Sequence, residues 1–437
     1  MLQPLLRSYF EEIGMTLPMV TDVERIMVRV PFRERVAEWN SILVANWQIV
    51  EVIRVVTEDP DVVGYGETLV HYTWAPVTDD TIRRAVAHSI GAFMTDDSVG
   101  AGLQMALYDA VGKATGLPMH RLFGQPLVRD WCPISWWNTK MPPEILADEA
   151  RSAVAEGYLA HKIKARPWFD VRDQIAAISS VTPPSYKVDI DWNSMLRSPA
   201  EALPLLLELS AEERVGIFES PIPRTDVAGH AMLRNRTGRP LAEHFDATLF
   251  PTWMARDALD GFVVYGAGVT GLVHQAALCA AFNKPFWLQV CGTGITTAMT
   301  AHLGATMTHA RWPMVTGMNA FATDLLREPL TIRGGLVQVP TGPGLGIVVD
   351  ESALERLQVS NLAPVKCPRR ILTMQLNDGR AVHFASIESA WAYCLSDGAL
   401  PVQPRGARLT LRPDDGTGDF AELYARAQRQ AVWDVGS

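Results

Sequence analysis

The feature that most constrains the fold of this sequence is a regular alternation between residues 131 and 315. Short apolar runs alternate there with amphipathic stretches of about 10–15 residues, a pattern typical of strand–helix units repeated around a parallel sheet. Eight such units in roughly 190 residues favour a (β/α)8 barrel, in which catalytic groups lie at the C-terminal ends of the strands. The strands are predicted to centre on Cys132–Ile134, His161–Lys164, Lys187–Asp191, Val215–Glu219, Pro240–Glu243, Gly261–Tyr265, Pro285–Val290 and Trp312–Val315.

The residues before and after this alternation have a different character. Period-two apolar stretches separated by turns predict an antiparallel meander over residues 20–73, and helical spacing predicts a helical region over Asp79–Thr115. The segment Pro340–Gly346 is too rich in glycine and proline for the interior of an element, so ordered coil is expected around it. The tail is predicted to contain a hairpin at Leu372–Gly379 and a helix near Phe420–Trp433.

Composition excludes several classes of function. The chain of 437 residues has a net charge of −9 at pH 7, which argues against nucleic acid or an anionic membrane as the main partner. An anionic substrate therefore needs a local positive site. Five scattered cysteines without a C-x-x-C pair favour reduced thiols in the cytoplasm over disulfides or a zinc cluster. No signal-peptide pattern and no apolar run of about 18 residues is present, so no transmembrane span is expected.

Two lysines of the stretch His161-Lys162-Ile163-Lys164-Ala165 supply that positive charge. Side chains of a strand alternate, so Lys162 and Lys164 point to the same face. Charged groups on the inward face of a buried strand are costly unless they are paired or functional. An ammonium group crowded by a second ammonium or by a metal loses its proton more readily, which makes such a lysine a candidate general base.

Three successive predicted strands end on a carboxylate. These are Asp191 in Asp189-Ile190-Asp191, Glu219 before Ser220-Pro221, and Glu243 in Leu241-Ala242-Glu243. Barrel geometry brings such strand ends together, where three carboxylates repel one another unless a cation holds them. Oxygen ligands favour a hard divalent cation such as Mg²⁺ over zinc. The sequence therefore predicts a metal site that faces the two lysines.

Together these motifs resemble the enolase superfamily, in particular its mandelate racemase and muconate-lactonizing branches. The resemblance covers roughly residues 20 to 360 and is specific because several weak motifs combine in order. It rests on Lys162-x-Lys164, Asp191-x-Asn193, Glu219-Ser220-Pro221, Glu243, Val63-Gly64-Tyr65-Gly66-Glu67, the run Tyr108–Pro118, and Pro340–Gly346 followed by Ile347-Val348-Val349-Asp350.

The resemblance implies an α/β fold: a modified (β/α)8 TIM-type barrel with an N-terminal α+β capping domain. The implied parts are the capping domain (1–125), the barrel (126–320), a segment closing back on the capping domain (321–364) and a C-terminal extension of unknown role (365–437). It also implies Mg²⁺ held by Asp191, Glu219 and Glu243, with Lys164 as the base and Lys162 as its pKa-lowering, carboxylate-binding neighbour. The implied reaction is removal of the proton α to a substrate carboxylate through an enediolate.

The side of the site opposite Lys164 departs from the family pattern. The muconate-lactonizing branch has a second lysine at the end of the sixth strand, where this sequence has Tyr265. The mandelate racemase branch has a histidine on the seventh strand, and Leu288–Gly294 contains none. A two-base racemase is therefore not expected, and Tyr265 is the candidate weak acid. His244 is predicted by alternation to point away from the barrel interior.

Substrate-binding residues are expected in two places. His71, Tyr72 and Trp74 follow the Gly64-Tyr65-Gly66-Glu67 turn, where the superfamily places a specificity loop, and Asn193 lies just beyond Asp191. Gly266–Gly271 has the G-x-G-x-x-G spacing, but no matching acid lies about 20 residues on, which favours a tight turn over a nucleotide cofactor. Binding of an anionic group at the N-terminus of the helix after that turn stays a possibility.

Three functions fit this sequence. The first is a Mg²⁺-dependent lyase that dehydrates a hydroxy acid, such as a sugar acid, because one lysine base has no second base opposite. The second is an isomerase, either a racemase/epimerase or a lactonizing cycloisomerase. The third, of another class, is a non-catalytic barrel that binds a carboxylate. The expected partner is a small-molecule carboxylate, with no nucleic acid or membrane, and we also expect a homo-oligomer.

Overall fold

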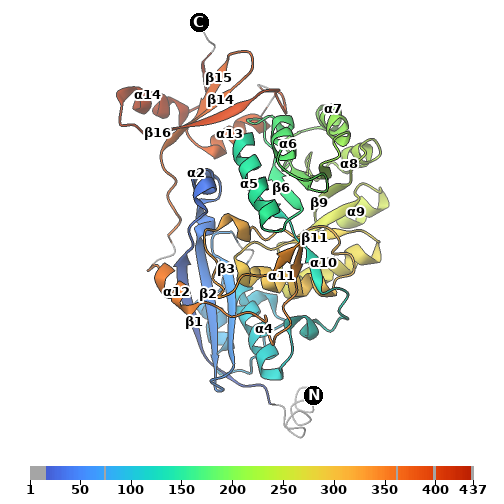
Figure 1. The fold of residues 1–437 in the computed structure, drawn as a ribbon, viewed down its shortest axis with the longest axis vertical. Helices are drawn as coiled ribbons and strands as arrows, with labels where there is room; N and C mark the ends of the chain where they lie inside the picture. The colour runs from blue at the N-terminus through green and yellow to red at the C-terminus, as the bar shows by residue number, and fades with distance from the viewer. Residues whose placement is uncertain (1–15, 73–74, 361–362, 397–399, 435–437) are drawn as a thin grey trace.

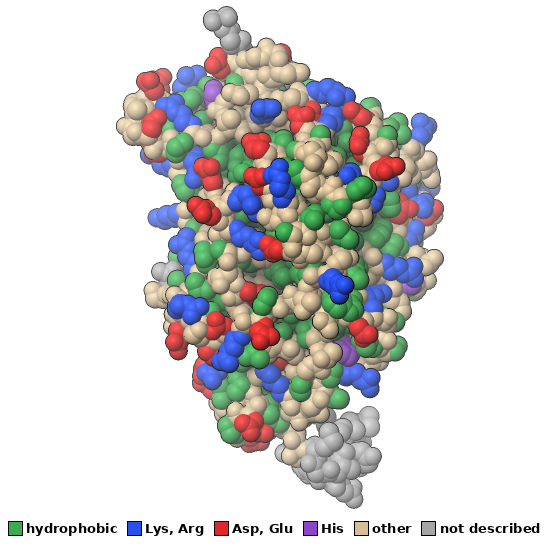
Figure 2. Space-filling view, in the orientation of Figure 1, with side chains coloured by type: hydrophobic (Ala, Val, Ile, Leu, Met, Phe, Trp, Pro, Cys, Tyr) green, Lys and Arg blue, Asp and Glu red, His purple; other side chains and the backbone are tan. Residues whose placement is uncertain are grey.

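The computed structural model describes residues 16–72, 75–360, 363–396 and 400–434 (Figure 1). Their strands form a three-stranded sheet of order β1-β2-β3, a seven-stranded sheet of order β11-β10-β9-β8-β7-β6-β5, a small sheet β12-β13-β4 and a four-stranded sheet β16-β14-β15-β17. The α/β class, the barrel and the additions at both ends are as predicted. Acidic and basic side chains are interspersed over the face shown in Figure 2, with no large area of one sign there.

The N-terminal part contains the predicted meander, in which β1 pairs with β2 and β2 with β3, all antiparallel. Helix α2 lies between β1 and β2 and was not indicated by the sequence. The predicted helical region is divided into α3, η2 and α4. The long helix α4 lies directly on β3 because Gly64 and Gly66 have no side chain; a Cβ on either would come within 2.1 Å of an α4 carbonyl oxygen. The elements are β1 (Val20–Arg29), α2 (Glu34–Leu43), η1 (Ala45–Gln48), β2 (Ile49–Thr57), β3 (Val63–Leu69), α3 (Asp79–Ala85), η2 (Asp97–Val99), α4 (Ala101–Thr115) and η3 (Met119–Phe123).

The central part is a parallel sheet whose strands alternate with helices, curled into a barrel as predicted (Figure 1). Its strands are almost entirely buried, because helices cover the outer face and side chains fill the interior. The elements are β5 (Trp136–Trp137), α5 (Pro143–Ala155), β6 (Ala160–Lys164), α6 (Val171–Ser179), β7 (Lys187–Asp191), α7 (Pro199–Ser210), β8 (Val215–Glu219), α8 (Val227–Arg234), β9 (Leu241–His244), α9 (Phe250–Ala255), β10 (Gly261–Tyr265), α10 (Val269–Ala281), β11 (Phe286–Gln289) and α11 (Gly294–Thr306).

Two of the eight predicted strands need correction. The stretch Cys132–Ile134 was predicted to open the barrel, but β4 (Trp131–Pro133) pairs antiparallel with β13, and β5 opens the barrel sheet. The stretch Trp312–Val315 forms only isolated parallel bridges, Met314 with Ile134 and Val315 with Gln289, which join the two edges of the sheet. A short apolar run has the same composition in either pairing, so the sequence alone did not distinguish these cases.

The remaining chain forms two further parts. Pro340–Gly346 is ordered coil, as predicted, and its Gly344 exchanges backbone hydrogen bonds with Leu117 and Met119 of the N-terminal part. The tail forms its own sheet with the predicted hairpin β14–β15 and a helix in the predicted region, and it lies above the barrel beside α2 in Figure 1. The elements are η4 (Met318–Ala320), β12 (Ile332–Arg333), β13 (Leu336–Gln338), α12 (Glu351–Leu357), β14 (Arg370–Gln375), β15 (Ala381–Phe384), α13 (Ile387–Leu395), β16 (Arg408–Pro413), α14 (Gly418–Ala427) and β17 (Val432–Asp434).

Acidic side chains from the N-terminal part bind the N-termini of the last two barrel helices. Asp97 accepts hydrogen bonds from the backbone N–H groups of Thr270 and Gly271, at 3.0 and 2.8 Å, at the start of α10. Glu67 does the same for Thr293 at the start of α11. Carboxylates in these positions satisfy otherwise unpaired N–H groups and complement the helix dipole. The N-terminus after the Gly266–Gly271 turn is therefore already occupied by a carboxylate of the chain itself.

A buried histidine pair gives one testable consequence for stability. His302 on α11 lies with its Nδ1 3.2 Å from Nδ1 of His120, and its Nε2 contacts the Leu345 carbonyl oxygen. Burial lowers the pKa of His302 to about 4. Because the pKa is lower in the folded than in the unfolded chain, this stabilisation is complete above about pH 6.5 and declines as the pH falls toward the folded value.

We therefore expect the free energy of unfolding to fall by about 2 kcal/mol more in the unmodified protein than in His302→Gln between pH 7 and pH 5. Urea unfolding at both pH values measures the difference. Parallel pH dependences in the two proteins would show that His302 does not remain neutral in the folded state.

Among the described helices, none has both the length and the apolar character that a membrane span requires.

Candidate active site

The candidate site forms where parallel strands align their polar ends in one row. In the register of the sheet, Lys164 of β6 lies beside Asp191 of β7, and Asp191 lies beside Glu219 of β8. Residues two positions apart share a face, so Lys162 and Asp189 form the next layer deeper in the barrel. The lysine pair and two of the three predicted carboxylates are therefore brought together at the C-terminal end of the sheet.

The deeper lysine, Lys162, is held as a cation. It is 1% exposed, and its Nζ donates to Oε1 of Gln289 at 2.6 Å and lies 3.6 Å from Oδ2 of Asp191. It also forms an ion pair with Glu219 and lies 5.2 Å from the ring centre of Trp287. Burial by itself lowers the pKa of the amine, but the carboxylates of Glu219 and Asp191 outweigh burial and raise the pKa above its usual value.

The outer lysine, Lys164, behaves in the opposite way. Its Nζ donates to Oδ2 of Asp191 and lies 3.4 Å from Oδ1 of Asn193. Burial lowers its pKa, and the positive charge of Lys162 lowers it further, against the opposing effect of Asp191. The two amines therefore differ in character: one stays charged, while the other gives up its proton more readily than a free lysine.

The carboxylate between them, Asp191, is fully buried and strongly stabilised as an anion. Burial by itself raises its pKa, but Lys164, Lys162 and Arg166 overcome that effect and hold the pKa below its usual range. Its Oδ1 also accepts a hydrogen bond from the Asn193 backbone N–H at 2.8 Å. Asp191 is therefore held in its ionised form.

The carboxylates of Asp191 and Glu219 gather with a histidine, not with Glu243. Ligand atoms of Asp191, Glu219 and His244 all lie within 4.8 Å of one another, and Nε2 of His244 is 3.1 Å from Oε1 of Glu219. The prediction that His244 points away from the barrel interior was wrong. Ala242, not Glu243, pairs with Glu219 in the register, so His244 occupies the next inward position.

The predicted third ligand, Glu243, is buried on the other side of β9. Its Oε1 accepts a hydrogen bond from the Ser220 hydroxyl at 2.8 Å, and its Oε2 lies 3.7 Å from Nε2 of His230 on α8. Glu243 therefore does not join the group formed by Asp191 and Glu219 in this structure.

The donor set fits a divalent cation. Glu219 is fully buried between the Lys162 amine and Nε2 of His244, and Nδ1 of His244 is buried without a hydrogen-bond partner in the described part of the chain. The buried carboxylates of Asp191 and Glu219 lie side by side and repel each other, and a bound cation would relieve that repulsion. Two carboxylates and one imidazole within this distance suit a divalent metal.

These contacts predict which side chain is the third ligand. His244→Ala is expected to weaken divalent-cation binding about tenfold or more, because one donor of the group is lost. Glu243→Gln is expected to change it little, because its carboxylate faces Ser220 and His230. Titration calorimetry with Mn²⁺ and with Mg²⁺ measures both variants. The reverse ranking would restore Glu243 as the ligand and place His244 outside the set.

The side opposite the lysines is formed by Tyr265, Gln289 and Cys291. The ring of Tyr265 lies edge-on to His244 with centroids 4.3 Å apart. Gln289 was missed from the sequence, although it pairs with Tyr265 in the register and so lies on the same inward face. Burial raises the pKa of the Cys291 thiol to about 11, which makes this thiol a poor nucleophile at neutral pH.

The loop that follows β3 brings one tyrosine to the site. Tyr72 packs on Trp47 with ring centroids 4.8 Å apart, and the Cys291 thiol, with burial of the hydroxyl, raises the Tyr72 pKa. Of the predicted substrate-binding residues, His71 is exposed on the same loop, and Trp74 lies outside the described residues. Asn193 is in the site, where its Oδ1 also accepts a hydrogen bond from Arg166.

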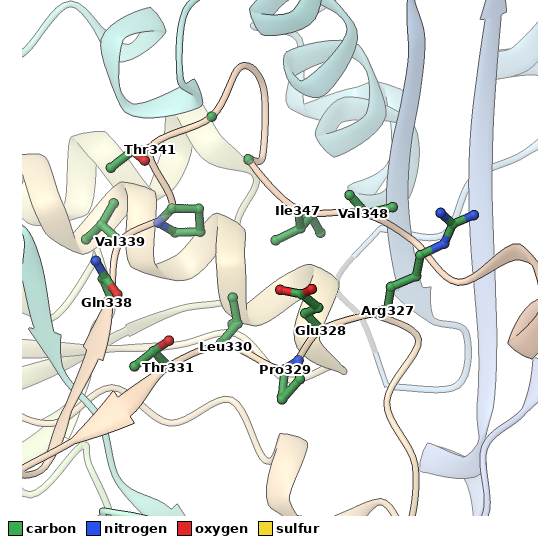
Figure 3. Close-up of a pocket in the computed structure, with 13 residues that line it drawn as sticks. Arg327, Glu328, Pro329, Leu330, Thr331, Gln338, Val339, Thr341, Ile347 and Val348 are labelled. Atoms are coloured by element: carbon green, nitrogen blue, oxygen red, sulfur yellow. The ribbon is translucent and has the colours of Figure 1, made fainter.

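A separate hollow lies away from this group. A hollow of about 500 Å³ is lined by residues 327–331, 338–342 and 346–348 of the segment after the barrel (Figure 3). Figure 3 shows Thr331, Leu330 and Glu328 along one side, with Thr341 and Ile347 across from them. None of these residues belongs to the lysine–carboxylate group, and the hollow contains no comparable set of converging charges. The chemistry therefore points to the barrel end.

Comparison with known proteins gives one consistent picture. Residues 145–353 match the family described as enolase C-terminal domain-like. The chain is 26% identical over 372 residues to muconate cycloisomerase 1-2 of Acinetobacter lwoffii, covering 78% of this chain and 95% of that protein. It is 25% identical over 360 residues to D-gluconate dehydratase of Thermoproteus tenax, covering 71% and 70%.

A solved structure shows the same fold. The 2-chloromuconate cycloisomerase of Rhodococcus opacus 1CP superposes with a TM-score of 0.63 at 21% identity, over 79% of this chain and 100% of that one. The curated relatives carry out different reactions, so similarity at this level does not select one of them.

Proposed function

Because this chain is a member of the enolase superfamily, we propose that it removes the proton α to the carboxylate of a small organic acid. The observation that carries the proposal is the unequal pair of lysines beside Asp191. A lysine serves as a general base only when its amine is neutral, and the lowered pKa of Lys164 favours that form. Its Nζ is the atom that takes the proton.

Lys162 has the complementary role. Its amine stays charged between Glu219 and Asp191 and donates to Gln289, so it is fixed in place before the substrate arrives. A preorganised cation of this kind stabilises negative charge that develops on the substrate carboxylate as the proton leaves. The fixed position requires no reorganisation during the reaction.

We further propose that Asp191 and Glu219, with His244 as third donor, hold a divalent cation, Mg²⁺ in keeping with the superfamily. Such an ion supplies Lewis-acid stabilisation of the substrate carboxylate when bound. Asn193 orients the reacting amine, because its Oδ1 is shared between Lys164 and Arg166. The buried ring of Trp47, on which the half-exposed Tyr72 packs, gives this side of the site an apolar wall.

The reaction that we propose is dehydration of a hydroxy acid, with a sugar acid as the substrate class. A second lysine or histidine base opposite Lys164 is absent from the described β10 and β11, where Tyr265 and Gln289 stand instead. Removal of an α-proton followed by loss of a β-hydroxyl as water requires one base and a weak acid, and we propose Tyr265 as that acid. Racemisation or cyclisation is the second candidate, in keeping with the cycloisomerase relatives.

Incubation of the protein with Mg²⁺ and a library of sugar acids tests this assignment. We expect a 2-keto acid to accumulate with one or a few members of the library, detected as its semicarbazone. Exchange of the α-proton without elimination would instead assign racemase or epimerase activity. Tight binding with neither exchange nor product would support the non-catalytic carboxylate-binding barrel.

A further inference from the structure

The C-terminal extension, residues 365–437, covers part of the barrel mouth. The loop after β6 is attached to it through Asp170, whose N–H donates to the Ala407 carbonyl oxygen at 3.2 Å. The Asp170 carboxylate also accepts from the Gly406 N–H at 3.0 Å. Arg370 forms an ion pair with Glu38 of α2, which anchors the extension to the N-terminal part. Figure 1 shows the extension beside the ends of α5 and α6.

One side chain of this extension contacts the residues around the candidate site. Trp391 of α13 places its ring 4.5 Å from the guanidinium carbon of Arg166 and 5.1 Å from the amine of Lys140. Arg166 follows β6 by two residues, and Lys140 follows β5, so both lie at the C-terminal end of the barrel. Aromatic faces attract cations, and Trp391 therefore holds both charges against the mouth.

Neither cation has a carboxylate partner of its own. Arg166 is fully buried and donates only to neutral acceptors, namely the carbonyl oxygens of Ala165 and Asp191 and the Asn193 side chain. Lys140 forms no hydrogen bond or ion pair with the residues that the structure describes, and burial together with the positive charges of Arg166 and Lys164 lowers the pKa of its amine, against the opposing effects of Asp191 and Glu388. Buried or half-buried cations are normally paired, because the loss of hydration is otherwise uncompensated.

At the barrel mouth the positively charged side chains outnumber the carboxylates that pair with them. With Lys164 neutral as the base, the cations around the candidate site are Lys140, Lys162 and Arg166, and the carboxylates beside Lys162 are Asp191 and Glu219. The other buried carboxylates at this end have partners elsewhere, Asp170 at Arg172 and Glu243 at Ser220 and His230. Asp189 lies one layer deeper, beside Lys162. A divalent metal adds further positive charge. The α-carboxylate of a substrate neutralises only part of the surplus, and the remainder is concentrated at Lys140 and Arg166, away from the deeper pair.

We propose that Lys140, Arg166 and Trp391 form a second anion subsite, so that the preferred substrates carry an anionic group at the end remote from the reacting carboxylate. The inference rests on the proposed function, because it places the reacting end of the substrate at Lys164. It also gives the C-terminal extension a role: the extension completes the substrate site by supplying the aromatic wall. A carboxylate and a phosphate group share the chemistry that such a subsite recognises.

Matched ligands that differ only at the remote end test this subsite. Gluconate, glucarate and 6-phosphogluconate carry a hydroxymethyl, a carboxylate and a phosphate group there, and galactonate with galactarate gives a second pair. Calorimetry with the full-length, Mg²⁺-loaded protein is expected to show at least tenfold tighter binding of one doubly anionic acid than of its singly anionic match. The ranking of glucarate and 6-phosphogluconate identifies which anion the subsite takes.

Substitutions assign the preference to the subsite. Lys140→Met is expected to remove the preference, leaving the affinity for the singly anionic acid unchanged. Trp391→Leu, which keeps apolar bulk without the aromatic face, is expected to reduce the preference severalfold. The control is Lys366→Met, the same change at an exposed lysine of the extension. Thermal unfolding of each variant shows that it is folded.

Three results would overturn the subsite: equal binding of matched acids, no binding of any of the five, or an equal effect of Lys140→Met on both members of a pair. The subsite is tested by binding, whereas the proposed reaction is tested by proton exchange and product formation. A failure of the subsite can therefore be told apart from a failure of the proposed reaction.

Discussion

Replacement of Lys164 by alanine is expected to lower the turnover number by about 10³-fold, because a positioned general base typically contributes about 10²–10⁴. The Lys164 amine combines a lowered pKa with a position beside Asp191 and Asn193. Substrate binding should change much less than turnover, because Lys162 and the metal ligands remain. Steady-state kinetics with the acid identified from the library measures both quantities.

A matched control separates this effect from a general loss of lysine charge. Lys187 lies at the opposite end of the barrel on β7, is exposed, and donates to the Glu213 carbonyl oxygen. Lys187→Ala should leave turnover within about twofold of the unmodified protein, since surface substitutions rarely matter. Partial recovery of the Lys164→Ala variant by added methylamine would support proton transfer at this position. Full activity of Lys164→Ala would eliminate it as the base.

The second large effect is expected at the carboxylates. Asp191→Asn and Glu219→Gln should each abolish tight binding of Mg²⁺ and raise the reaction barrier by about 3–4 kcal/mol, the cost of losing one stabilising group. Both substitutions keep the shape of the side chain while removing the charge. Asp191→Asn leaves the buried Lys164 amine without its counter-ion, so the metal-free variant should be less stable by about 3–5 kcal/mol. Glu219→Gln removes one of the two carboxylates beside Lys162, so its loss of stability should be smaller.

Calorimetric titration with Mg²⁺ and urea unfolding measure these two consequences separately. The control is Glu213→Gln, the same change as Glu219→Gln at an exposed position just before β8, which should alter neither. Retention of Mg²⁺ affinity in both Asp191→Asn and Glu219→Gln would place the cation elsewhere. Loss of stability without loss of affinity would mean that these carboxylates serve the lysines alone.

The parts of the site that follow from strand alternation were predictable from sequence. Lys162 and Lys164 share a face because they are two residues apart, and parallel register then aligns Asp191 and Glu219 beside them. Which residue of β9 points into the barrel was not predictable in the same way. A shift of one residue in the register decides whether Glu243 or His244 points inward. That choice depends on pairing with β8, which a single sequence does not encode locally.

The features that the sequence did not predict depend on contacts between distant segments of the chain. Cys132–Ile134 has the composition of a barrel strand, and only the position of β13 shows that it pairs in an antiparallel sheet. Trp391 meets Lys140 and Arg166 because the extension folds back over the loops after β5 and β6. No local pattern predicts which surface an added sheet covers, so this contact required the three-dimensional arrangement.

Exchange of the substrate α-proton with solvent is the most direct test of proton abstraction at Lys164. The protein, Mg²⁺ and the acid selected from the library are incubated in D₂O, and deuterium at the α-carbon is followed by proton NMR in substrate and product. We predict deuterium incorporation, or loss of the α-proton into product, that requires both Mg²⁺ and Lys164. Turnover of the acid at an undiminished rate in Lys164→Ala, or with the α-proton retained, would contradict the account.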